Sequence, residues 1–94
     1  MPRPCLEETF DEFVWRFGEE CVTITRVESS WQVSHLTAGR LMGPLQCVYQ
    51  ATHHHPKHAA WDVMAKVTGA VHDDEEGVQT AMRAAQWMKR SFSA

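Results

Sequence analysis

Four of the six histidines lie in one short segment, residues 52–58, which reads THHHPKH. Neutral imidazole is a good zinc ligand, and it is also the side chain that titrates near neutral pH. On a helix, His54 and His58 would share a face, and on a strand His53 and His55 would do so. The candidate metal ligands are therefore His53, His54, His55 and His58.

The spacing of these histidines matches no zinc-finger pattern, and no paired cysteine motif accompanies them. Adjacent side chains diverge, so we do not expect all four rings to reach one ion. Pro56 within the segment is typical of a turn. We therefore interpret the segment as a polar loop between two elements. A small zinc-binding domain is the alternative function, and zinc is the one cofactor considered.

Other residue types in the chain could support nucleophilic catalysis. His35 or His72 could in principle pair with a cysteine thiol such as that of Cys47. Nothing in the sequence places such a pair together, and a buried structural thiol is the simpler interpretation of Cys47. The sequence contains no glycine-rich phosphate loop, G-x-S-x-G or H-E-x-x-H motif. We therefore expect no enzymatic activity and no catalytic residues.

Composition and charge describe a small globular protein. The chain has 94 residues, of which 44% are hydrophobic and 22% charged, and its formal net charge is −3. It is expected to form one domain over residues 1–94. The net negative charge argues against direct binding of nucleic acid. The three cysteines form no C-x-x-C motif, and neither a signal peptide nor a membrane span is evident. A cytoplasmic location with free thiols is expected, without a membrane partner.

Periodicity predicts a helix over residues 5–20 and strands over residues 21–28, 31–37 and 45–52. In the first segment, Leu6, Phe10, Phe13 and Phe17 fall on one helical face, and Gly18 is a suitable helix end. The next segments alternate apolar and polar residues or are rich in β-branched residues, as in "CVTITRVE", which is typical of strands.

Residues 59–71 fit both a strand and a helix that begins at Pro56. A strand is preferred, because it would pair with the third strand across the histidine loop. A final helix begins at Asp73 or Asp74 and carries Lys89 near its end. Its predicted buried face contains Val78, Ala81, Met82, Ala85, Met88 and Phe92. The fold class is α+β: a four-stranded antiparallel sheet with an N-terminal and a C-terminal helix (α-β-β-β-β-α).

Two tryptophans fall opposite the predicted buried faces of these two helices. Trp15 lies among the acidic residues of the first helix, and Trp87 lies opposite Val78 and Met82 on the last. Exposed tryptophan is typical of interface hot spots. The predicted partner-binding residues are Trp15, Trp87, Glu8, Asp11, Glu12 and Arg83. We expect a protein partner or, as an alternative, a homodimeric structural module.

The segment from Trp61 to Ser91 combines an acidic turn with an alanine-rich helix that has a tryptophan near its end. It reads WDVMAKVTGAVHDDEEGVQTAMRAAQWMKRS. This arrangement resembles the ends of small accessory proteins of phages and mobile elements, several anti-CRISPR proteins among them. The resemblance covers about the last third of the chain and transfers no functional residue. It implies a non-enzymatic inhibitor of a host protein complex, such as a CRISPR effector.

Overall fold

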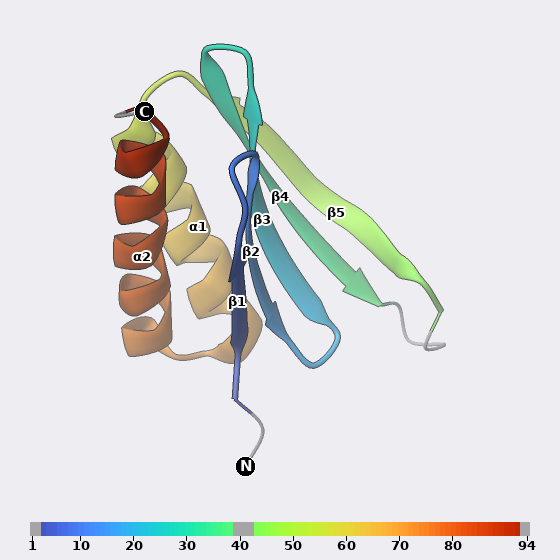
Figure 1. Cartoon of the computed structure of the whole chain (residues 1–94). Coiled ribbons are helices and arrows are strands. Elements are labelled where there is room, and N and C mark those ends of the chain that lie inside the picture. Colours follow the sequence, from blue (N-terminus) through green and yellow to red (C-terminus); the bar gives the residue numbers. More distant parts are fainter. Residues whose placement is uncertain (1–2, 39–42, 93–94) are drawn as a thin grey trace.

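The computed structural model describes residues 3–38 and 43–92. Its strands are β1 (Cys5–Glu8), β2 (Glu12–Phe17), β3 (Glu20–Val27), β4 (Ser30–Ala38) and β5 (Leu45–His53), and its helices are α1 (Pro56–Val71) and α2 (Asp74–Phe92). The strands form one antiparallel sheet in the order β1-β2-β3-β4-β5. The α+β class, with an antiparallel sheet and two helices, is confirmed. The predicted count of four strands and the predicted element order are wrong, because all five strands precede both helices (Figure 1).

The helix predicted over residues 5–20 is instead a hairpin of β1 and β2, followed by the start of β3. Aromatic and β-branched residues favour extended backbone, and β2 is rich in them. Thr9 holds the turn, because its backbone N–H donates to the carbonyl of Glu12 and its hydroxyl accepts from the N–H of Glu12. In β2, Phe13 and Trp15 then point to the same side of the sheet. The fit to helical spacing was accidental.

The three central strands are joined by tight turns. Gly18, predicted to end a helix, lies between β2 and β3 with a φ of 58°, which glycine adopts without a steric penalty. Between β3 and β4, Glu28 has a φ of 57°. Strands β4 and β5 cover their predicted segments, and β3 begins and ends one residue before its predicted segment. The pairing of Ile24 with both Phe13 and Val33 places apolar side chains from three strands in one row.

Residues 59–71 belong to helix α1, so the preferred strand is wrong and the helical alternative is correct. The imidazole Nδ1 of His55 accepts a hydrogen bond from the backbone N–H of Lys57 and caps the helix. Pro56 occupies the first turn, where its missing N–H is not needed. His72 ends the helix in the left-handed conformation, with a φ of 54°. Local capping at both ends therefore outweighs the alternating pattern within the segment.

Helix α2 begins as the sequence predicts, but its predicted buried face is correct only in part. Ala81 and Met88 are buried, Ala85 is exposed, and the side chain of Phe92 lies outside those that the structure describes. The Asp73 carboxylate accepts from the backbone N–H groups of Glu75 and Glu76 and caps the helix. The buried residues are Gly77, Thr80, Ala81, Ala84, Trp87 and Met88. Val78 and Met82, assigned to the buried face by their spacing, are exposed. The prediction failed there because α2 is apolar over an arc wider than the sheet can cover.

The two helices lie side by side against one face of the sheet (Figure 1). The core between the layers consists of Phe13, Trp15, Val22, Ile24, Trp31, Val33, Ala59, Ala60, Val63, Val67, Ala84, Trp87 and Met88. The first half of β5 extends past the helices and is exposed. Within the described ranges, neither helix is long and apolar enough to cross a membrane.

Candidate functional site: a groove between the two helices

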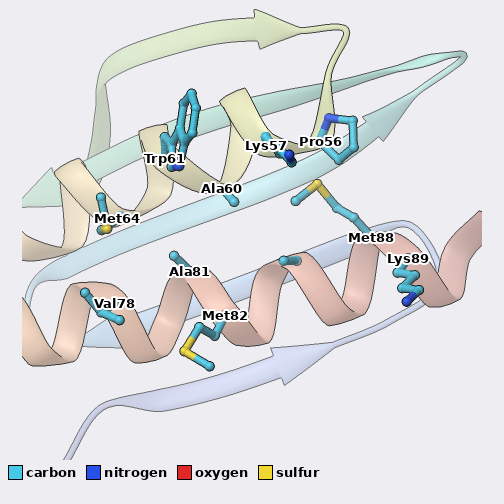
Figure 2. Close-up of a pocket in the computed structure, with 11 residues that line it drawn as sticks. Pro56, Lys57, Ala60, Trp61, Met64, Val78, Ala81, Met82, Met88 and Lys89 are labelled. Carbon is cyan, nitrogen blue, oxygen red and sulfur yellow. The ribbon is translucent and has the colours of Figure 1, made fainter.

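A hollow on the surface runs between α1 and α2, on the side of the helices that faces away from the sheet. It has a volume of about 730 Å³. Figure 2 shows Ala60 and Met64 of α1 opposite Ala81 and Met88 of α2, with Lys57 and Lys89 at one end. The lining residues are Pro56, Lys57, Ala60, Trp61, Met64, Val78, Ala81, Met82, Ala85, Met88 and Lys89. The groove is therefore almost entirely apolar, with two cations at one end.

Large apolar side chains on the rims of the groove are open to solvent. Trp61 on α1 is 58% exposed, and Met82 on α2 is 55% exposed. Small side chains form the floor, where Ala60 and Ala81 are nearly buried. A contiguous exposed apolar surface on a small protein is typical of an interaction site.

Every methionine in the described part of the chain, namely Met64, Met82 and Met88, lines this groove. Methionine is unbranched and has a polarizable sulfur, so it adapts its shape to an apposed surface. The groove consequently has a compliant lining with one large rigid aromatic ring, that of Trp61. This composition suits the binding of an apolar protein surface better than the binding of a polar small molecule.

Gly77 sets how closely the two helices approach at the end near the turn. A Cβ atom on Gly77 would lie 1.9 Å from Oγ1 of Thr68 and 2.8 Å from the backbone carbonyl oxygen of Met64. Both distances are far below van der Waals contact, so only glycine fits at this position. The close approach fixes α2 against α1 and thereby positions the two walls of the groove.

The two tryptophans predicted to face a partner are in the core. Trp15 is 0% exposed and Trp87 is 3% exposed. The indole N–H of Trp15 donates to Glu76 Oε2 over 3.1 Å, and that of Trp87 donates to the backbone carbonyl of Thr9 over 2.7 Å. The outward orientation predicted for them is therefore wrong. Trp15 was assigned to a helix that does not form, and Trp87 to the solvent side of a helix that turns this face to the sheet.

The charged residues predicted around those tryptophans do not form one surface with them. Glu8 on β1 pairs with Arg90 and also with Arg83, whose Nη2 lies 3.6 Å from Glu8 Oε2. Both pairs join the edge strand to α2. Asp11 and Glu12 are exposed near the turn between β1 and β2. Glu8 and Arg83 consequently support the fold, and the exposed acids lie on the sheet rather than in the groove.

The four clustered histidines have separate surroundings. His53 points to Asp62, with 2.7 Å between its Nε2 and Oδ2 of that carboxylate. His54 is exposed and His55 caps α1. The His58 ring lies between those of His55 and Trp61, with centroids 5.1 and 5.6 Å away. Over residues 3–38 and 43–92, no three His, Cys, Asp or Glu side chains are grouped as metal ligands would be.

Asp62 is the centre of a polar cluster between β5 and α1. Its side chain is only 9% exposed and accepts hydrogen bonds from the Tyr49 hydroxyl over 2.8 Å and from His53. Lys66 Nζ lies 3.9 Å from the carboxylate and 3.7 Å from the centroid of the Tyr49 ring. The hydrogen bond to Asp62, with burial and the negative charge of that carboxylate, raises the pKa of Tyr49. The cluster joins the edge strand to the helix.

A second hollow, of about 500 Å³, lies beside the turn between α1 and α2 and includes His72, Asp73 and Glu76. Its two carboxylates already have structural partners, because Asp73 caps α2 and Glu76 accepts from Trp15 and Thr80.

The three thiols and His35 do not line the groove between the helices. Cys21 is buried, Cys5 and Cys47 are exposed, and His35 faces Glu20 at 3.4 Å.

Comparison of the chain with protein-family models, with curated proteins and with solved structures finds no match. The class of protein is thus given by the fold alone: an α+β protein in which a helical hairpin covers one face of a five-stranded meander. Sequence reasoning missed Trp61 and Met64 as surface residues, because it placed them on a strand. The available signal was the cap and proline before α1, which would have put both on one helical face.

Proposed function

We propose that this chain is a small non-enzymatic protein-binding module and that its docking surface is the groove between α1 and α2. One observation carries the proposal. The apolar stripe Val78–Met82–Ala85 has the spacing of a core face, yet the fold leaves it in an open groove. Burying exposed apolar area contributes about 25 cal/mol per Å². A partner that covers this stripe therefore forms a complex stabilised by the removal of its apolar area from water.

The ionisable groups that are partly buried support a binding role rather than a catalytic one. Asp62 joins β5 to α1, Glu76 joins β2 to α2, and Glu8 joins β1 to α2. Each carboxylate is thus occupied by contacts between elements. The resemblance of residues 61–91 to accessory proteins of mobile elements suggests a host protein complex, such as a CRISPR effector, as a further class of partner.

A capture experiment with matched variants tests the role of the groove. Met82→Glu places a charge on the stripe without removing a core side chain. Val48→Glu is the control, because Val48 on β5 is 58% exposed but lies outside the groove. We expect wild type and Val48→Glu to retain the same proteins and Met82→Glu to lose them, with circular dichroism showing that all three are folded. Retention that is equal in all three contradicts the proposal.

A further inference from the structure

Helix α2 carries a stripe whose residues recur at intervals of three and four. Its members are Glu75, Val78, Met82, Ala85 and Lys89. This is the spacing of the seam in a pair of packed helices. The last four line the groove, and Val78 and Met82 are exposed there. The stripe is therefore positioned for contact with another helix.

The two ends of the stripe carry opposite charges at equal distances from its centre. Glu75 lies seven residues before Met82, and Lys89 lies seven residues after it. Asp74 adds a second carboxylate at the acidic end, whereas Arg90 at the basic end pairs with Glu8 of its own chain. An antiparallel copy of the same helix, centred on Met82, would place each carboxylate opposite an ammonium group. The stripe spans about 21 Å at 1.5 Å per residue.

We infer that the partner in the groove is a second copy of this chain, related by a two-fold axis that passes near Met82. The inference rests on the proposed function, since it names the occupant of the same groove. A two-fold contact requires a surface that is complementary to itself. The stripe meets this requirement, because reversing its direction exchanges its acidic and basic ends and leaves Met82 in the centre. In this arrangement the Trp61 ring flanks α2 of the other copy.

The opposite charges at the two ends allow a test by exchange. The Lys89→Glu chain has acidic groups at both ends of the stripe, and the Glu75→Lys chain has basic groups at both. Each variant alone would bring like charges together twice across the axis. An equal mixture of the two would restore two attractive pairs. Neither side chain belongs to the core, and Val48→Glu again serves as the control.

Light scattering at increasing concentration measures the result. Wild type and Val48→Glu are expected to reach twice the chain mass of 10.7 kDa. Each charge variant is expected to self-associate at least about tenfold more weakly, and the mixture to regain the dimer. Met82→Glu is expected to stay monomeric. Circular dichroism confirms that every variant is folded.

Three results would overturn the inference. They are a wild type that stays monomeric, a dimer that Met82→Glu leaves intact, and an equal mixture of the two charge variants that does not form a dimer. The capture experiment separates this failure from failure of the proposed function. If wild type is monomeric but retains other proteins through the groove, only the second copy is wrong. If wild type is monomeric and Met82→Glu retains the same proteins as wild type, both proposals are wrong.

Discussion

The indole N–H of Trp15 on β2 donates a hydrogen bond to Oε2 of Glu76 on α2, although the two residues are 61 positions apart. The Thr80 hydroxyl donates to the same oxygen over 3.1 Å. This contact joins the sheet to the second helix through a fully buried side chain. It shows that tryptophan in this chain has two separate roles, since Trp15 holds the layers together and Trp61 lies on the surface.

Replacing Trp15 by Phe should lower the free energy of unfolding by about 1–3 kcal/mol, because Glu76 loses a donor and the core loses volume. At concentrations low enough to keep the chain monomeric, Trp61→Phe should change it by less than about 0.5 kcal/mol, since that side chain is then mostly exposed. Urea unfolding of the two variants measures both effects. Equal changes in the free energy of unfolding would contradict a buried Trp15 and an exposed Trp61.

Gly77→Ala should destabilise the protein by about 1–3 kcal/mol, because the new methyl group collides with Thr68 and with the backbone of Met64. Gly69→Ala is the matched control on α1. A Cβ there meets nothing within 4 Å, and alanine in a helix is favoured over glycine by about 0.5–1 kcal/mol. Thermal unfolding should therefore shift in opposite directions. A stabilising Gly77→Ala would argue against the close helix contact.

Tyr49 is the only tyrosine, so its ionisation can be followed by ultraviolet absorbance. Its folded-state pKa is raised, mainly because the hydroxyl donates to Asp62. The resulting stabilisation is complete at pH values below the unfolded pKa of about 10. It is lost as the pH rises through the folded pKa, because ionisation removes the donor. Native protein should titrate at higher pH than protein in urea, and Asp62→Ala should lower the native midpoint. Identical native and unfolded midpoints would contradict the contact.

The three thiols should react at different rates with a disulfide reagent at mildly alkaline pH. Cys5 and Cys47 are exposed, whereas burial raises the pKa of the Cys21 thiol. Since the thiolate is the reactive form, two thiols should react quickly and the third only as fast as the protein opens. Cys21→Ser should remove the slow phase alone. Rapid reaction of all three would show that β3 is not protected as the structure indicates.

Strong local signals were sufficient to predict α2 and strands β3 to β5. Asp73 caps α2 through its side chain, and Val22 and Ile24 alternate with threonines along β3. The error in residues 5–20 arose because four apolar residues, Leu6, Phe10, Phe13 and Phe17, fit helical spacing by chance. Pairing across the hairpin, as of Leu6 with Trp15, adds to the extended preference of β2, and such a contact between separate segments is not encoded in local periodicity.

The groove could not be predicted for a related reason. A helical wheel identifies apolar residues but does not say which of them the sheet will cover when the apolar arc is wide. On α2 the sheet covers Ala84 and Trp87, and Met82 is left outside. The roles of the clustered histidines likewise depend on where each one lies in the fold. His55 caps α1, and His53 meets an aspartate that was assigned to a strand.

The most direct test of the groove is a methyl NMR spectrum of the protein labelled at methionine and isoleucine, recorded over a range of concentrations. Ile24 is the only isoleucine and is fully buried beneath the helices, so its methyl signals serve as the internal control. We predict that the Met82 methyl signal shifts or broadens as concentration rises and that the Ile24 signals stay fixed. A Met82 signal that is unchanged from dilute to concentrated solution would contradict the two-fold contact through this groove.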